Sequence, residues 1–162
     1  MTGIIINQLE ALLESDSRLI TKASQFSSFI FNSFENINWA GFYFFDGIKL
    51  ILGPFQGNTA CEMIEISNGV CGKAFSKAMV INVPDVNVFP GHISCDCNSR
   101  SELVIPLIKE GKIFGVFDID SPICGRFSSE EKLFTVLVEI FSSHVEYSDR
   151  FSPVFAAITG DV

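Results

Sequence analysis

Three cysteines in polar surroundings are the side chains of this sequence best suited to chemistry. Cys61, Cys71 and Cys95 each stand near glycine, histidine or a carboxylate residue rather than inside an apolar run. A thiol in such surroundings can ionise and react, whereas a structural cysteine is normally enclosed by apolar side chains. The pattern therefore indicates a thiol enzyme. Buried, unreactive thiols are the competing interpretation, and that interpretation suits Cys124 better than Cys95.

Cys71 has a second argument for reactivity. It precedes a short predicted helix over 72–78, and the dipole at the start of a helix lowers the pKa of a thiol. Zinc binding is a different use of the same kind of side chain. Its ligands would be His92, Cys95 and Cys97, together with Cys61 or Cys71. The spacing H-x-x-C-x-C is tighter than that of the usual pairs of zinc ligands, so the sequence favours thiol chemistry and predicts no metal.

Asp118 and Asp120 are the carboxylates with the most suggestive position. They follow the apolar run 113–117, and because side chains alternate along a strand, both project to one face. Carboxylates at the end of a buried strand lose hydration, which raises their pKa values. Two other interpretations stay open: a solvated strand end, and a hard-cation site, which would need more oxygen ligands. Glu102 opens the strand after a long loop and by itself is typical of a surface residue.

Trp39 and Tyr43 form an aromatic pair in a predicted strand. Trp39 is the only tryptophan of the chain, and Tyr43 follows four positions later, so both lie on one strand face. A pair of core aromatics is the plainer interpretation.

The composition predicts one domain over 1–162 with a large aromatic core. Hydrophobic residues make up 48% of the 162 residues, and 17 residues are Phe. The net charge of −8 argues against nucleic acid as a partner, because nucleic acid requires a basic face.

No apolar stretch reaches the ~18 residues of a membrane helix. No secretory signal is visible, so we expect a cytoplasmic protein with no membrane partner. The five cysteines cannot all pair within one chain.

The order of the predicted elements indicates an α+β fold. Apolar residues recur every three or four positions over 18–34, which predicts a buried helical stripe. The remaining predictions are a helix over 4–13, strands over 38–45, 48–52, 61–66, 79–83, 103–109 and 112–119, a short helix over 72–78 and a final helix over 128–147. Ser128 and Glu131 predict a capping box at the start of the final helix. Residues 84–101 have no periodicity, and a loop this long is usually a lid or a binding loop.

Motifs spread along the chain carry a family resemblance. They are Asn38-Trp39-Ala40-Gly41-Phe42-Tyr43, Leu52-Gly53-Pro54-Phe55-Gln56-Gly57 leading to Ala60-Cys61, Gly69-Val70-Cys71-Gly72-Lys73-Ala74, Phe89-Pro90-Gly91-His92-Ile93-Ser94-Cys95-Asp96, Ser99-Arg100-Ser101-Glu102 and Gly115-Val116-Phe117-Asp118-Ile119-Asp120-Ser121. Together they resemble the free methionine-(R)-sulfoxide reductases, which are built on a GAF domain. Two departures stand out: Cys97 is an extra thiol, and Ser67 replaces an expected glycine. Neither departure removes a site residue.

The resemblance implies a GAF fold. An antiparallel sheet of about six strands would carry the N- and C-terminal helices on one face. A loop-covered pocket on the other face would hold one free amino acid. The resemblance also implies the reaction, which is thiol-dependent reduction of free L-methionine (R)-sulfoxide to L-methionine.

Residue by residue, the resemblance assigns roles to the three thiols. Cys95 corresponds to the attacking thiolate, which becomes a sulfenic acid, and Cys61 corresponds to the resolving thiol that forms an intramolecular disulfide with it. Cys71 corresponds to a second recycling thiol, or to the attacker if the order is reversed. A thioredoxin-like dithiol would reduce the disulfide, and no cofactor is implied.

The resemblance also assigns the substrate-binding residues. Glu102, Asp118 and Asp120 correspond to the substrate-binding carboxylates, and Trp39 with Tyr43 correspond to an aromatic wall. A non-enzymatic GAF sensor of a small molecule is the alternative function, and the lack of an output domain or long signalling helix argues against it. The sequence leaves the oligomeric state open, with a homodimer among the possibilities.

Overall fold

The computed structural model describes residues 2–91 and 98–146 of the chain. The elements in chain order are α1 (Thr2–Leu13), α2 (Leu19–Ser33), β1 (Trp39–Phe45), β2 (Leu50–Gly57), β3 (Met63–Ile64), α3 (Gly69–Lys77), β4 (Ile81–Val83), the 3₁₀ turn η1 (Val86–Val88), β5 (Ser101–Lys109), β6 (Lys112–Ser121) and α4 (Glu131–His144). The predicted α+β class is confirmed.

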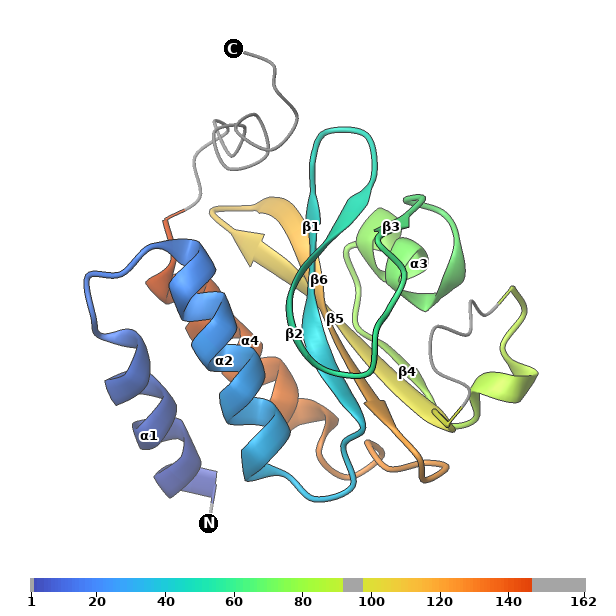
Figure 1. The fold of residues 1–162 in the computed structure, drawn as a ribbon, viewed down its shortest axis with the longest axis horizontal. Coiled ribbons are helices and arrows are strands. Elements are labelled where there is room, and N and C mark those ends of the chain that lie inside the picture. Colours follow the sequence, from blue (N-terminus) through green and yellow to red (C-terminus); the bar gives the residue numbers. More distant parts are fainter. Residues whose placement is uncertain (1, 92–97, 147–162) are drawn as a thin grey trace.

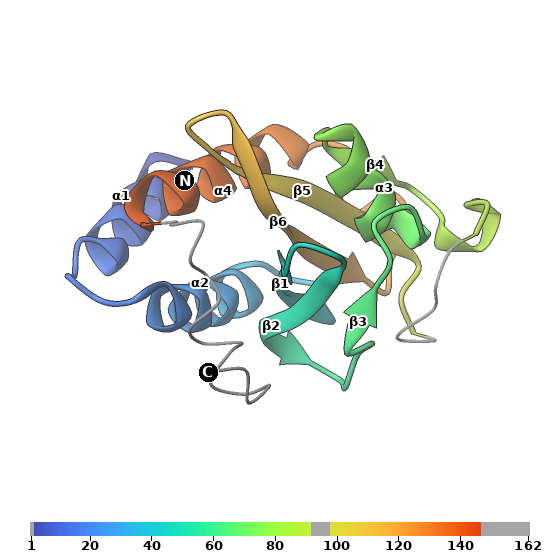
Figure 2. The same ribbon diagram turned by 90° about the horizontal axis from the view of Figure 1, so that it is seen from above.

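The strands form one sheet in the order β3-β2-β1-β6-β5-β4. Every described pair of neighbours is antiparallel, and the sheet curls strongly when seen from above (Figure 2). The two long strands β5 and β6 are joined by the tight turn Glu110-Gly111, in which both residues have positive φ. The predicted antiparallel sheet of about six strands is therefore correct.

Helices α1, α2 and α4 pack together on one face of the sheet (Figure 1). The core on this side, the helix face, is aromatic and is built around Phe26 of α2. The ring of Phe26 lies 4.8 Å from that of Phe117 in an edge-to-face arrangement and 5.0 Å from that of Phe141. Such pairs stabilise a core beyond the area that they bury. The terminal helices are therefore where the sequence predicted them.

Helix α3 covers the opposite face of the sheet (Figure 1), which the sequence had assigned to loops. A second core cluster lies on this side, the site face, and it includes Trp39, Tyr43, Val70 and Cys71. Helix α3 begins at Gly69, earlier than predicted, and this glycine has a φ of 62°. The left-handed conformation suits glycine, and it turns the chain so that Cys71 falls in the first helical turn.

Two local predictions are wrong. The strand predicted over 61–66 contains only Met63–Ile64. The capping box is absent, because α4 begins at Glu131 and its N-cap residue Glu130 makes no side-chain capping bond. Ser128 lies in the preceding turn, where its backbone N–H donates to the carbonyl of Gly125. Among the described helices, none combines the length and apolarity that a bilayer crossing requires.

Candidate active site

The register of three neighbouring strands places the carboxylates beside the aromatic pair. Trp39 of β1 lies opposite Asp120 of β6, which in turn lies opposite Glu102 of β5. Asp118 stands two positions before Asp120, opposite Gly41 of β1. Residues paired in this way point to the same side of a sheet. All of these side chains therefore stand on the site face.

The carboxylates differ in their exposure to solvent. Glu102 is 6% exposed and Asp118 is 7% exposed, while Asp120 is half-buried. A solvated strand end is therefore the wrong interpretation for Asp118, and a surface position is the wrong interpretation for Glu102. Sequence alternation correctly placed Asp118 and Asp120 on one face, but it could not reveal that Glu102 joins them from β5.

Cys71 of α3 meets the two buried carboxylates. Its sulfur and one carboxylate oxygen from each of Glu102 and Asp118 lie within 4.8 Å of one another, and its thiol donates a hydrogen bond to Asp118. Gly72 allows α3 to lie this close to the preceding segment. A Cβ at position 72 would be 2.3 Å from the carbonyl oxygen of Glu65, which no side chain could tolerate.

Burial raises the pKa of each group in this cluster. The pKa of Glu102 is well above its usual range because the carboxyl is desolvated, and the charge of Asp120 raises it further. Desolvation and the charge of Glu102 raise the pKa of Asp118, and hydrogen bonds from Cys71 and the backbone of Ile119 oppose part of that rise. Each carboxyl is therefore held toward its neutral form.

The thiol of Cys71 also has a pKa well above its ordinary value. Desolvation is the largest cause, and the charges of Asp118 and Glu102 add to it. The prediction that the helix dipole would lower this pKa is therefore wrong. Burial and the two neighbouring carboxyls therefore favour the protonated form of the Cys71 thiol.

One oxygen of Asp118 has no hydrogen-bond partner among the described residues. Its Oδ1 is buried and accepts no hydrogen bond from any residue in 2–91 or 98–146. A buried acceptor without a donor costs free energy. A cationic or N–H-bearing ligand that entered the cluster would recover this cost.

The aromatic wall is a stack of three rings. Trp39 is 2% exposed and Tyr43 is 1% exposed, and their ring centres lie 6.0 Å apart. Phe55 of β2 stacks on Trp39 at 5.4 Å, a contact that sequence reasoning missed although Phe55 stands in one of the motifs. Gly41 makes room for the indole, because a Cβ there would be 2.6 Å from Cη2 of Trp39.

The polar ends of the wall anchor the segment that contains Cys61. The indole N–H of Trp39 donates to the carbonyl of Asn58 at 3.0 Å, and the hydroxyl of Tyr43 donates to the carbonyl of Cys61 at 3.0 Å. Cys61 is half-buried and packs against the site-face cluster. These bonds place the Cys61 backbone at the edge of the wall.

The predicted residues His92, Cys95 and Cys97 lie outside the described residues, but both neighbouring segments contact the site face. On one side, Lys73 of α3 donates to the carbonyl of Pro90 at 2.7 Å. On the other side, the amide of Asn38 donates to the hydroxyl of Ser99 at 3.0 Å.

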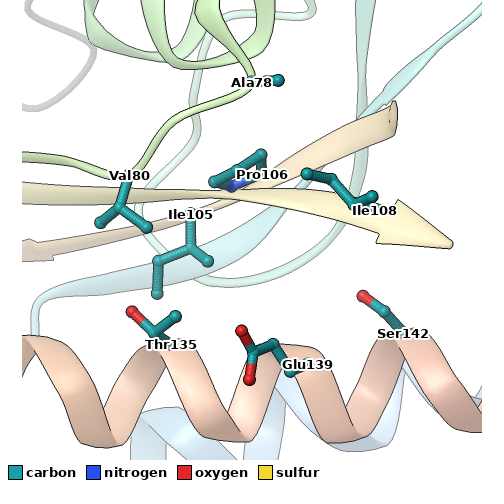
Figure 3. A pocket seen from close by; sticks show the side chains of 8 residues that line it. All are labelled: Ala78, Val80, Ile105, Pro106, Ile108, Thr135, Glu139 and Ser142. Atoms are coloured by element: carbon teal, nitrogen blue, oxygen red, sulfur yellow. The ribbon is translucent and has the colours of Figure 1, made fainter. Parts of the chain in front are cut away.

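A hollow of about 220 Å³ lies apart from this cluster, between β5 and α4 (Figure 3). Ile105 and Pro106 line its sheet side, and Thr135, Glu139 and Ser142 line its helix side. Neither Cys71 nor any of the three carboxylates borders it. The candidate site is therefore assigned from the cysteine and the carboxylates, and not from this hollow.

A comparison with known protein families decides where the chain belongs. The model of the GAF domain matches residues 4–147. The chain belongs to the GAF domain family. This GAF domain is 43% identical over 122 residues to the free methionine-R-sulfoxide reductase of Escherichia coli, covering 75% of this chain and 74% of that protein.

Solved structures agree with this assignment. The free methionine-R-sulfoxide reductase of Neisseria meningitidis, solved in complex with its substrate, superposes with a TM-score of 0.84 and 32% identity over 88% of this chain and 87% of that one. A putative GAF sensor protein from Burkholderia vietnamiensis superposes with a TM-score of 0.85 and 42% identity over 89% of this chain and 92% of that one. The family resemblance predicted from the motifs is confirmed.

Proposed function

We propose that this GAF domain reduces the R epimer of free L-methionine sulfoxide to L-methionine. The observation that carries the proposal is the pair of buried carboxyls, Glu102 and Asp118, on the same sheet face as the Trp39 and Tyr43 wall. The identity to the Escherichia coli reductase supports the same activity.

Asp118 is the proposed partner of the substrate's ammonium group. Its Oδ1 has no donor among the described residues, and an ammonium carries three N–H donors. A positive charge next to a carboxyl favours the ionised form, so the arriving substrate would convert Asp118 into a carboxylate. The faces of Trp39 and Tyr43 suit the S-methyl group and tolerate positive charge that develops on sulfur.

Glu102 is the proposed general acid, and Asp120 is the proposed second hydrogen-bond donor to the sulfoxide oxygen. The sulfoxide oxygen carries negative charge, and a thiolate can displace it from sulfur only as the oxygen gains a proton. Burial holds Glu102 toward its protonated form, which is the form that a general acid requires.

Cys95 is the proposed nucleophile. Its thiolate attacks the substrate sulfur, a proton reaches the oxygen, and the oxygen transfers to give Cys95 sulfenic acid and methionine. Cys71 suits this role less well, because burial and two neighbouring carboxyls raise the pKa of its thiol and so disfavour the thiolate.

Cys61 is the proposed resolving thiol. Its thiol condenses with the sulfenic acid, which forms a disulfide and releases water. Cys71 is a second thiol for recycling. A thioredoxin-like dithiol would then reduce the protein disulfide and become oxidised itself.

The test is a chirally resolved assay on the reduced protein. We expect consumption of free methionine (R)-sulfoxide with little turnover of the S epimer or of N-acetylated and peptide-bound sulfoxide, because Asp118 requires a free ammonium. Comparable rates on peptide sulfoxide would contradict the proposal.

A sensor is the second candidate, and the similarity to the putative sensor from Burkholderia vietnamiensis supports it. A sensor would bind free methionine or its sulfoxide without turnover. Stoichiometric release of methionine by the reduced protein, with no added reductant, would exclude a purely sensory role.

A further inference from the structure

The cluster of Cys71, Glu102 and Asp118 has the composition of a metal site. These residues come from α3, β5 and β6, and one potential ligand atom from each lies within 4.8 Å of the others. The donor set of one sulfur and two oxygens suits a borderline cation such as Zn²⁺, whereas Mg²⁺ and Ca²⁺ prefer oxygen alone. This set differs from the one considered from the sequence, which centred on His92, Cys95 and Cys97.

The three potential ligand atoms lie within the same small region as the ligands of a zinc site. Zn–S bonds of ~2.3 Å and Zn–O bonds of ~2.0–2.2 Å place the ligands of one tetrahedral ion about 3–4 Å apart. The observed atoms lie within 4.8 Å of one another, so the three ligands would have to move closer together to bind one ion.

A second observation points to a ligand at the same place. Oδ1 of Asp118 belongs to a side chain that is 7% exposed, and none of the described residues donates to it. Buried carboxylates are normally paired or coordinate metals. A dication would satisfy this oxygen and offset the repulsion between the two carboxyls.

We propose that the reduced protein binds one Zn²⁺ at Cys71, Glu102 and Asp118, and that the bound ion excludes the amino-acid substrate. The exclusion rests on the proposed function, in which Asp118 holds the substrate's ammonium. Coordination replaces the S–H bond of Cys71 with an S–Zn bond and releases that proton to solvent. Three protein ligands leave a fourth position for water. Zinc would therefore inhibit the enzyme reversibly, and it would also withhold Cys71 from disulfide chemistry.

The direct test measures metal binding without substrate. Reduced, metal-free protein is titrated with Zn²⁺ against a chromogenic chelator, and Co²⁺ serves as a spectroscopic probe of thiolate ligation. We expect one ion per chain and a thiolate-to-cobalt charge-transfer band. Cys71→Ser should abolish that band, and Cys71→Ser and Asp118→Asn should each weaken zinc binding at least about tenfold.

Cys124→Ser is the matched control, because Cys124 is an exposed thiol outside the cluster. It should leave both the zinc affinity and the cobalt band unchanged. Failure of the parent to bind one zinc ion overturns the proposal. Zinc binding that is unchanged in both Cys71→Ser and Asp118→Asn also overturns it, because the ion would then lie elsewhere.

Exclusion of substrate is measured separately. Free methionine (R)-sulfoxide should displace Zn²⁺ from the parent, and simultaneous binding of both would refute the exclusion. The proposed function itself is tested by turnover of the metal-free enzyme with excess chelator present. A failure of the zinc site and a failure of the reductase activity therefore give different results.

Discussion

The two faces of the sheet differ in whether they bury acidic side chains. The helix face is almost wholly apolar, with Phe26, Phe117 and Phe141 packed ring against ring and fully buried. The site face encloses a thiol and two carboxyls, and it leaves an oxygen of Asp118 without a donor among the described residues. The helix face is arranged for stability, and the site face holds groups whose burial costs free energy.

One sheet can contribute both to the stable core and to the candidate site because its two faces are separate. Adjacent residues of β6 point to opposite faces, so Phe117 joins the aromatic core while Asp118 joins the cluster. Apolar burial on one side can offset the desolvation of carboxyls on the other. Substitutions on the two faces should therefore have opposite effects on activity and on stability.

The largest expected effect is on the chemistry of Cys95. Cys95→Ser should reduce methionine release in a single turnover without reductant to background. Cys61→Ser should still release about one methionine per site and stop at the sulfenic acid, because only resolution is lost. The measurement is rapid quench with quantification of methionine. If Cys71→Ser abolishes the single turnover and Cys95→Ser does not, the attacking thiol belongs to α3.

The next effect concerns the acid on the site face. Glu102→Gln keeps the shape of the side chain but loses the titrating proton, and we expect a single-turnover rate ~10²–10⁴-fold lower. In the parent, the rate should fall as pH rises through the raised pKa of Glu102, provided that the attacking thiol is already ionised. Rate profiles measured against pH check this. Superimposed profiles for the two proteins, or loss of parent activity in EDTA, would show that Glu102 is not the acid.

The smallest effects are on stability, and they have opposite signs on the two faces. Phe26→Ala should lower the free energy of unfolding by ~3–5 kcal/mol and leave the activity per folded molecule unchanged. The control is Ile20→Ala, at an exposed position of the same helix, which should change the free energy of unfolding by less than ~0.5 kcal/mol. Urea denaturation measures both.

Glu102→Gln should instead raise the melting temperature at neutral pH. The raised pKa of Glu102 means that the folded state binds the proton more tightly than the unfolded state, so the parent loses stability as pH rises above the ordinary carboxyl pKa. The advantage of the variant should therefore vanish at low pH. Melting curves across pH test this, with the exposed Glu139→Gln as control. A gain that is independent of pH would contradict it.

The sequence predicted most elements and the strand faces that two pairs of residues share, because these depend on local periodicity. Strand alternation placed Asp118 with Asp120 and Trp39 with Tyr43. The approach of Cys71 to Asp118 depends on how α3 docks, and that docking depends on contacts such as the close fit of Gly72 against Glu65, which no local pattern reveals.

The wrong predictions have the same physical origin. The dipole argument for Cys71 considered only its own helix, while burial and carboxyls from two distant strands determine its pKa. The capping motif at Ser128 was present in the sequence, but the chain is still turning there after Gly125. Prediction from neighbouring residues was wrong where contacts with distant residues or a preceding turn determined the pKa of a side chain or the start of a helix.

The stacked indole of Trp39 has an optical consequence. This residue is the only tryptophan of the chain, and it lies between Phe55 and Tyr43 in the wall of the candidate site. Tryptophan emission from the whole protein therefore originates at that wall. An amino acid that enters beside the ring, or a metal ion that binds across the strand from it, can be followed by intrinsic fluorescence without any added label.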